Sequence, residues 1–176
     1  MRVERLNEAH DLSGFACGVK PLDEWLRLHA LENQRRDLSR SFVLIDDTDV
    51  VIGYYALTMG GVVKGELPRR LWRGLPGYQI GMVLLARLAV DARRQGEGLG
   101  RDLMIDAIAH AAAAGQHAAG RLIAVDPIDE SARRFYRRFG FRDIEGDEHG
   151  RMFIRLDDAI ASFQAASDES SGGRPQ

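Results

Sequence analysis

The sequence predicts an α/β fold, and two neighbouring features are the main reason. Residues 82–91 form an apolar run without Gly or Pro that ends at Asp91, which is typical of a strand buried on both faces. Gly96, Gly98 and Gly100 then lead into a long apolar segment, 99–114, that favours a helix. Shorter strand and helix patterns flank this unit, so the two kinds of element alternate along the chain.

Length and composition are those of one globular domain. The chain has 176 residues with a net charge of −2, and we expect a single domain over residues 1–164. The Ser-, Gly- and acid-rich tail, residues 165–176, is expected to be disordered. Cys17 is the single cysteine, which excludes an internal disulfide and fits the cytoplasm. The sequence has no signal peptide, membrane-spanning run or metal-ligand spacing, so we expect neither a membrane nor a metal partner.

The N-terminal part is expected to form a strand over residues 2–6 and then a helix. Pro21 suits a first helical position, and Leu22, Trp25, Leu26 and Ala30 follow at helical spacing. The helix is expected to end at the basic pair 35–36. Strands are predicted over 41–45 and 50–57 around a turn at 46–49, and a long connection over 61–80.

The C-terminal part continues the alternation. The helix after the glycines should end at Gly115 and should expose only the stripe Asp102, Asp106 and His110. A strand over 121–125 and a helix over 129–139 follow, with Gly140 closing the helix. The segments 141–144 and 152–156 are predicted to form a final hairpin.

The glycine loop has the chemistry of a pyrophosphate site. The first amides of a helix lack internal partners and carry a partial positive charge, and alternate glycines let a phosphate approach the backbone. The P-loop pattern does not fit, because Arg101 and Asp102 follow Gly100 where Lys and Ser or Thr are needed. The dinucleotide fingerprint does not fit either, because its third glycine stands one residue further on. A glycine-rich turn without a ligand is the alternative.

Two motifs resemble those of the GNAT N-acetyltransferases. The first is Gln/Arg-x-x-Gly-x-Gly/Ala, which fits from Arg93 and, as we prefer, from Gln95. The second is Ala132-x-x-Phe135-Tyr136-x-x-x-Gly140-Phe141. The resemblance covers roughly residues 40–156. It implies a mixed, twisted sheet of six to seven strands with splayed central parallel strands and about four flanking helices.

The resemblance also implies where acetyl-CoA and the catalytic acid lie. The cofactor would bind Leu88, Ala89, Val90, Gln95, Gly96, Glu97, Gly98, Leu99, Gly100 and Arg101. Tyr136 takes the place of the tyrosine that donates a proton to the departing thiolate. A phenol with a pKa of about 10 can serve a thiolate with a pKa of about 8.5, although Tyr136 could instead fill the core. Many family members carry Asn where this chain has Asp129, which we interpret as a helix cap.

The N-terminal third resembles the GNAT toxins of bacterial toxin–antitoxin pairs. The matching residues are Phe15-x-Cys17-Gly18-x-x-x-Leu22-Asp23-x-Trp25-Leu26, then 40–43, 53–57 and 85–91. These toxins acetylate the α-amine of aminoacyl-tRNA and block translation, and their usual partner is a ribbon-helix-helix antitoxin. The absence of an evident general base agrees with an α-amine, whose pKa of about 8 leaves a useful neutral fraction at pH 7.

Clustered arginines are candidates for contact with the tRNA backbone. Without its tail of net −3 from Asp157 onward, the chain carries +1. The candidates are Arg35, Arg36, Arg40, Arg69, Arg70, Arg73, Arg87, Arg93, Arg94, Arg133, Arg134, Arg137 and Arg138. Two other functions stay open at this point, a small-amine or protein N-acetyltransferase and a non-enzymatic acyl-CoA-binding regulator. A homodimer is also left open.

Overall fold

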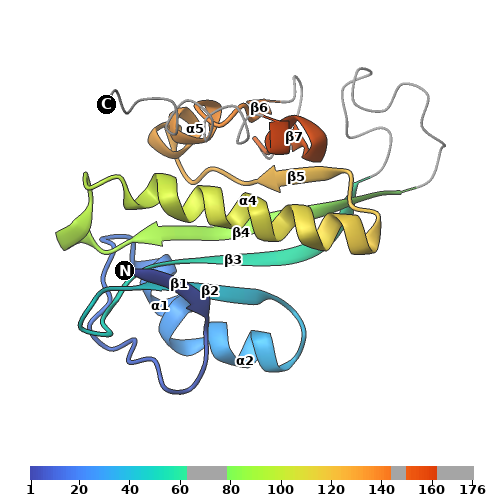
Figure 1. Cartoon of the computed structure of the whole chain (residues 1–176). Coiled ribbons are helices and arrows are strands. Elements are labelled where there is room, and N and C mark those ends of the chain that lie inside the picture. The colour runs from blue at the N-terminus through green and yellow to red at the C-terminus, as the bar shows by residue number, and fades with distance from the viewer. Residues whose placement is uncertain (63–78, 144–149, 162–176) are drawn as a thin grey trace, which may run out of the picture. The chain divides into compact units, whose positions relative to one another are not determined.

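The computed structural model describes residues 1–62, 79–143 and 150–161. Within these ranges seven strands form one mixed sheet in the order β1-β2-β3-β4-β5-β7-β6 (Figure 1). This confirms the predicted GNAT-type α/β sheet. The chain divides into two compact units, residues 1–59 with 85–107 and residues 60–84 with 108–176. The tail 165–176 lies outside the described ranges, as do residues 63–78 of the predicted long connection.

The first unit begins with β1 (Arg2–Arg5), α1 (Lys20–Leu28), α2 (Ala30–Arg35), β2 (Arg40–Ile45) and β3 (Val51–Val62) as far as Met59. The three strands pair antiparallel, with Arg2 opposite Ile45 and Arg40 opposite Leu57. The Asp46 carboxylate accepts hydrogen bonds from the amides of Thr48 and Val50, which forms the predicted turn between β2 and β3. Gly61 and Val62 extend β3 into the predicted connection, so the expected start of that connection was wrong.

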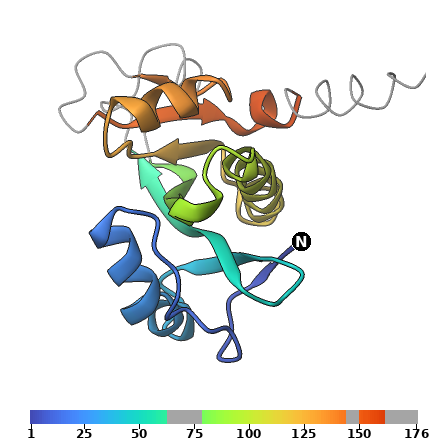
Figure 2. The ribbon, with the colours of Figure 1, turned by 90° about the vertical axis from the view of Figure 1, so that its left-hand side faces the viewer.

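Alternation along β3 assigns its two faces to different helices (Figure 2). The Tyr54 ring stacks on Trp25 of α1, and its hydroxyl donates to the Leu22 carbonyl at 2.9 Å. On the opposite face the Tyr55 hydroxyl donates to Asp106 of α4 (Leu99–Ala118). A Cβ on Gly53 would lie 2.8 Å from Leu103 Cδ1, so α4 packs directly against this glycine. Leu6, Phe15, Leu26 and Val43 complete the core around Tyr54.

The predicted N-terminal helix is divided in two. His29 has φ −125° and ψ −26°, outside the helical region, and therefore separates α1 from α2. Leu26 and Ala30 are fully buried, as the helical spacing predicted. The break leaves the buried stripe in place because the Asn33 amide still donates to the His29 carbonyl at 2.8 Å.

The second unit contains the start of β4 (Ile80–Val90), the end of α4, β5 (Leu122–Val125), α5 (Glu130–Arg137), β6 (Arg142–Asp143) and β7 (Met152–Arg155). β7 pairs antiparallel with β5 and with β6. The Arg121 amide, at the start of β5, donates to the Gly81 carbonyl at the start of β4, and the two strands point the same way (Figure 1). Val62, Met82, Leu122 and Phe153 pack together as the core of this unit.

The predicted end of α4 at Gly115 was wrong. The helix continues to Ala118, and the left-handed residue that follows it is Ala119, with φ 54°. Gly115 serves packing instead, since a Cβ there would lie 2.5 Å from Leu156 Cδ2 and 3.1 Å from the Gly120 carbonyl oxygen. Leu103, Met104, Ala107 and Ala111 of this helix are buried. Asp102 and His110 are exposed as predicted, but the expected narrow stripe was wrong, because Asp106 is half-buried under the Tyr55 hydroxyl and Ala109 and Ala113 are exposed as well.

Candidate active site

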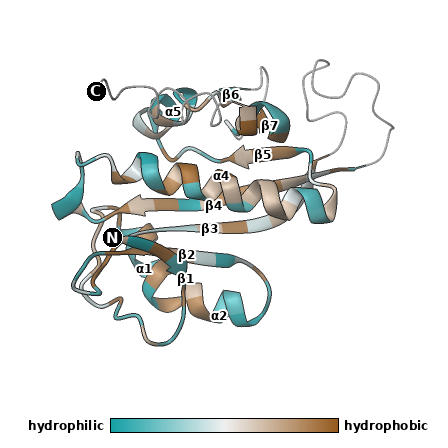
Figure 3. Cartoon of the chain, in the orientation of Figure 1, coloured by the Kyte–Doolittle hydropathy of each residue, from teal (hydrophilic) through white to brown (hydrophobic). Residues whose placement is uncertain are grey.

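The loop between β4 and α4 has the backbone shape that an anion site needs. A short 3₁₀ turn, η2 (Ala92–Arg94), follows β4, and the loop then passes through Gly96 with φ 86° and Gly98 with φ 84°. L-residues avoid these left-handed angles, so glycine is required at both positions for its conformation. A Cβ at either position would meet no atom within 4 Å. The end of β4 is apolar and the loop is hydrophilic (Figure 3).

The loop presents backbone amides at the start of α4. The amides of Arg101 and Asp102 donate to the Gly98 carbonyl, at 2.9 and 3.3 Å, and these are the first bonds of the helical ladder. The amides from Gly98 to Gly100 therefore precede the ladder and lie at its positive end. Leu99 is buried, as the preferred phase of the motif predicted, while Gly96, Glu97 and Gly98 are exposed.

Asp91 fixes the beginning of this loop. Its side chain is 1% exposed and accepts from the amides of Ala16 and Arg93 at 3.2 and 3.0 Å. The Arg93 guanidinium donates to both carboxylate oxygens at 2.8 Å. These donors, with Arg93 first, lower the pKa of Asp91 to about 2, against the desolvation that raises it. This role of Asp91 was not predicted, although an acid directly after a buried strand and before two arginines was the available signal.

The side-chain amide of Gln95 bonds to the protein itself, although the residue is exposed. Its side-chain amide donates to the carbonyls of Cys17 at 3.0 Å and Val90 at 3.1 Å. This side chain therefore joins two protein carbonyls, and the contact of Gln95 with acetyl-CoA stays a prediction.

The last residues of β4 combine burial with partial exposure. Ala89 and Val90 are buried and Leu88 is half-buried. Arg87 lies with its guanidinium carbon 4.8 Å from the centroid of the Trp25 ring, a cation–π contact. Its Nη1 also donates to the Ala86 carbonyl at 2.9 Å. The predicted cofactor and substrate contacts of these residues stay predictions.

Tyr136 lies in the second unit, on the buried face of α5. Its ring packs edge-on against Phe135 at 5.4 Å and is tilted against Phe141 at 5.8 Å. Burial raises the pKa of the Tyr136 phenol to about 12, and the Asp126 carboxylate adds to the shift. The phenol therefore keeps its proton at neutral pH, as a general acid requires. Asp129 caps α5 as predicted, accepting from the Ala132 amide at 2.7 Å.

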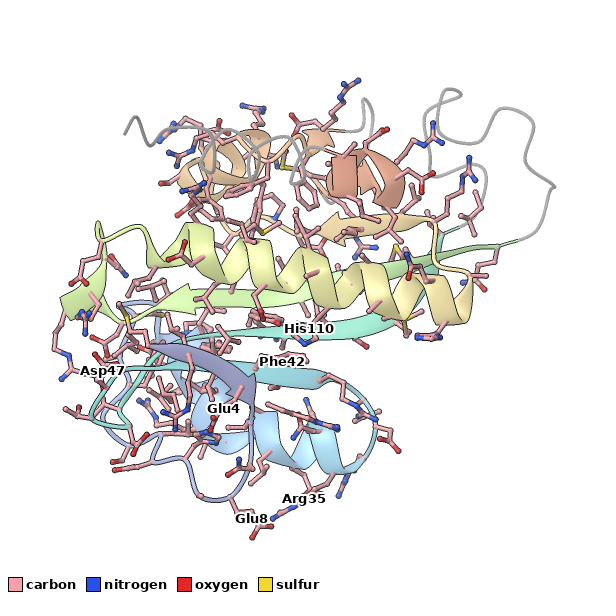
Figure 4. All side chains as sticks on the ribbon, viewed as in Figure 1. Glu4, Glu8, Arg35, Phe42, Asp47 and His110 are labelled. Atoms are coloured by element: carbon pink, nitrogen blue, oxygen red, sulfur yellow. The ribbon has the colours of Figure 1, made fainter. Side chains whose placement is uncertain are left out.

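Within the described ranges, most of the arginines predicted to meet tRNA are already paired with acids, and Arg69, Arg70 and Arg73 lie outside those ranges. Arg35 contacts Glu8 (Figure 4), and Arg36 pairs with Glu32 at 2.7 Å. Arg94 donates to both oxygens of Glu97, at 2.8 and 2.9 Å. Such exposed pairs contribute little to stability and can exchange partners.

The α5 arginines differ in how strongly they are held. Arg133 binds Asp143 and the Gly150 carbonyl, and Arg137 binds Asp143 at 2.8 Å and Glu130 at 3.2 Å. Arg138 lies over the Phe135 ring at 5.7 Å. Arg134 is exposed. The freer cations at this helix are thus Arg134 and Arg138, which the sequence grouped with Arg133 and Arg137 as candidates for contact with tRNA.

Neither a metal-binding cluster nor a membrane-spanning helix occurs in the described ranges. No group of three or more His, Cys, Asp or Glu side chains in them is arranged to hold a metal ion. No helix in these parts of the chain is both long and apolar enough to cross a bilayer.

Comparison with known proteins places this loop and sheet in a family. The model of the Acetyltransferase (GNAT) family matches residues 6–141. The chain therefore belongs to the GNAT acetyltransferase family, as its two motifs predicted.

Relatives and solved structures are similar over nearly the whole chain. A tRNA-acetylating toxin of Mycobacterium tuberculosis is 38% identical over 157 residues, which cover 89% of this chain and 93% of the relative. The structure of AtaT complexed with acetyl-methionyl-tRNAfMet superposes with a TM-score of 0.84 at 26% identity, covering 92% of this chain and 98% of that one. A tyrosine-to-phenylalanine mutant of AtaT, bound to the C-terminus of the antitoxin AtaR and acetyl-CoA, gives a TM-score of 0.78 at 25% identity, covering 92% and 97%.

Proposed function

We propose that this protein transfers the acetyl group of acetyl-CoA to the α-amine of aminoacyl-tRNA, and that it acts as a toxin that blocks translation. The observation that carries the proposal is the 38% identity to a tRNA-acetylating toxin over about nine-tenths of both chains. The loop supports it independently, because two left-handed glycines and the start of α4 form an anion site after an apolar strand.

The residues divide the chemistry between binding and proton transfer. Acetyl-CoA, when bound, supplies an acetyl thioester. The amides of residues 96–100 hold its pyrophosphate, and the backbone of Leu88–Val90 pairs with its pantetheine arm. The backbone amide near Ala89 stabilises negative charge that develops on the carbonyl oxygen.

Proton transfer falls to Tyr136. The neutral amine attacks the carbonyl carbon, the C–S bond breaks, and the phenol gives its proton to the departing sulfur. The amine nitrogen loses one proton to solvent, and the phenolate regains one from solvent, so charge balances. An amine with a pKa of about 8 has a usable neutral fraction near pH 7, and no protein base is then required.

The test is a transfer assay with defined acceptors. Purified protein is mixed with labelled acetyl-CoA and bulk aminoacylated tRNA, and deacylated tRNA is the control. Label should appear on the charged tRNA and be absent from the control. Label on polyamines or lysine peptides alone would instead support the small-amine or protein acetyltransferase. Turnover with any acceptor would exclude the non-enzymatic regulator.

We further propose that a small ribbon-helix-helix antitoxin neutralises the protein in the cytoplasm, where charged tRNA is found. The support is the likeness to AtaT, which has been solved bound to the C-terminus of its antitoxin AtaR. Expression of the chain alone should arrest growth, and co-expression of an adjacent small reading frame should restore it. Growth that is unaffected by the chain alone would contradict the toxin role.

The possible homodimer is a separate question, and light scattering of the purified protein tests it.

A further inference from the structure

The segment Gly14–Cys17 lies against the loop that follows β4, far away in sequence. Phe15 anchors it in the core, 1% exposed and edge-on to the Tyr54 ring at 5.5 Å. The Ala92 amide donates to the Ala16 carbonyl at 2.8 Å, so the backbones of the two segments touch directly.

Three side chains after β4 form hydrogen bonds with other backbone groups of this segment. Asp91 accepts from the Ala16 amide, Arg93 donates to the Gly14 carbonyl at 3.0 Å, and Gln95 donates to the Cys17 carbonyl at 3.0 Å. We call Asp91, Arg93, Gln95 and the segment Gly14–Cys17 the loop staple. The staple ends at Gln95, immediately before the first left-handed glycine.

The other end of the segment is held by α1. The Asp23 carboxylate, itself buried, accepts from the Cys17 amide at 2.8 Å, and Arg27 donates to the Phe15 carbonyl at 3.0 Å. Since α1 is packed on the Tyr54 face of β3, the loop is attached through the segment to a fixed part of the first unit.

We propose that Asp91 and Arg93 are positioning residues for acetyl-CoA, which hold residues 96–101 in the conformation that binds the pyrophosphate. The inference rests on the proposed function of that loop. Glycines are free to leave the left-handed region, so an unrestrained loop would sample many conformations. A buried carboxylate with four donors fixes the turn η2 and so removes that freedom shortly before the glycines begin.

The expected effect of removing the staple on the affinity for acetyl-CoA follows from the fraction of molecules whose loop has the binding conformation. The apparent Kd equals the intrinsic Kd divided by that fraction, so a loop competent about one-tenth of the time binds about tenfold more weakly. The chemical step is unaffected once acetyl-CoA is bound, because neither side chain touches the reacting atoms in this proposal.

The experiment compares Arg93→Ala with Arg2→Ala. Both arginines are exposed, 66% and 58% at the side chain, and each makes two guanidinium contacts to carboxylate oxygens at 2.8–3.0 Å. The two arginines differ in the carboxylates that they contact: Arg93 contacts the buried Asp91, whereas Arg2 contacts acids that are partly or fully exposed. Arg93→Ala should raise the Kd of acetyl-CoA by calorimetry, and its KM, about tenfold with kcat within about twofold. Arg2→Ala should leave all three unchanged.

Asp91→Asn is the stronger variant, and Arg93→Ala keeps the test decisive if Asp91→Asn fails to fold. A lower Tm for Arg93→Ala with an unchanged Kd would make the staple purely structural and overturn the inference. Gly98→Val separates this result from the proposed function. Abolished binding in Gly98→Val with intact binding in Arg93→Ala overturns the staple alone. Intact binding in both variants overturns the staple and also the assignment of the glycine loop as the acetyl-CoA site, while the transfer assay tests the proposed reaction separately.

Discussion

The Tyr136 phenol is buried by aromatic rings and keeps its proton well above neutral pH, with a pKa of about 12. If it protonates the departing thiolate, Tyr136→Phe removes that proton and little else, because the phenyl ring retains the packing. We expect kcat to fall about 10²- to 10⁴-fold, the usual range for general acid catalysis. The Kd of acetyl-CoA should stay the same by calorimetry on the same preparation.

Tyr55→Phe is the matched control for this variant. Tyr55 is also buried, and its hydroxyl donates to the Asp106 carboxylate of α4, so its loss should cost about 1.5–3 kcal/mol of folding free energy without changing kcat. A wild-type kcat in Tyr136→Phe would mean that Tyr136 only packs in the core and that the general acid is another group.

Asp91 also makes the stability of the protein depend on pH. Its folded pKa of about 2 lies below the unfolded value of about 3.9, so its ionised form stabilises the fold. The contribution is complete above about pH 5 and is lost as the pH falls toward the folded pKa. We expect it to be at most about 2 kcal/mol, because Arg93 is largely exposed to screening solvent.

Urea unfolding of wild type and Asp91→Asn from about pH 6 to about pH 2 measures this contribution. The difference in unfolding free energy should be constant at the upper end and shrink once the pH falls below the unfolded pKa of the carboxyl. A difference that keeps its size across the whole acidic range would mean that the charge of Asp91 contributes nothing.

The variant Gly98→Val tests whether the loop between β4 and α4 binds acetyl-CoA. Valine strains the left-handed position and puts a β-branched side chain where the phosphate must approach. At about a hundredfold excess over Kd, acetyl-CoA should add about 2.7 kcal/mol to the unfolding free energy of wild type. Thermal or urea unfolding with and without ligand should show that this gain disappears in the variant.

Gly18→Val separates backbone strain from ligand blocking. Gly18 has φ 88° and, like Gly98, would give a Cβ no neighbour within 4 Å, so the local strain is comparable. The control should lose similar stability and keep the ligand-dependent gain. If acetyl-CoA raised the unfolding free energy of both variants equally, the glycine loop would be a turn that does not bind the ligand.

The elements that the sequence predicted well are those in which local pattern and packing agree. β4, the glycine loop and the Asp129 cap of α5 follow from apolar runs, glycine spacing and capping chemistry. The end of α4 was mispredicted because Gly115 resembles a helix end, although contacts with Leu156 and Gly120 are what require it. The break at His29 was missed because the apolar stripe runs through it without interruption.

The site was harder to predict than the elements, because long-range contacts decide it. The bond from the Ala16 amide to Asp91 spans 75 positions, and that from Gln95 to Cys17 spans 78. No local pattern predicts such a pair. The motif identified Gln95 correctly as part of the loop, but only the structure shows that its side chain faces Cys17 and Val90.

Across the protein as a whole, charge pairing changes which arginines can meet a phosphate backbone. Asp143 and Glu130 each pair with both Arg133 and Arg137, so two negative charges compensate the charge of these two arginines. Arg134 is exposed, and the Arg138 guanidinium lies over the face of a ring. The α5 region therefore presents two cations whose replacement should leave the ion pairs of Arg133 and Arg137 intact.

Arg134 and Arg138 should therefore contribute to tRNA binding. We expect Arg134→Glu and Arg138→Glu each to weaken binding of aminoacylated tRNA and to flatten the dependence of log K on log salt by about 0.7–0.9 for each phosphate that is no longer neutralised. Fluorescence titrations at several salt concentrations give the slope. Acetyl-CoA affinity should not change, because the anion loop is untouched.

Arg5→Glu is the matched control, since Arg5 is exposed on β1 and the substitution changes net charge by the same amount. If the α5 variants and Arg5→Glu flatten the slope equally, then the effect is one of net charge and α5 makes no specific contact. If only the α5 variants do so, and the transfer assay loses label on charged tRNA in the same order, then α5 belongs to the surface that binds tRNA.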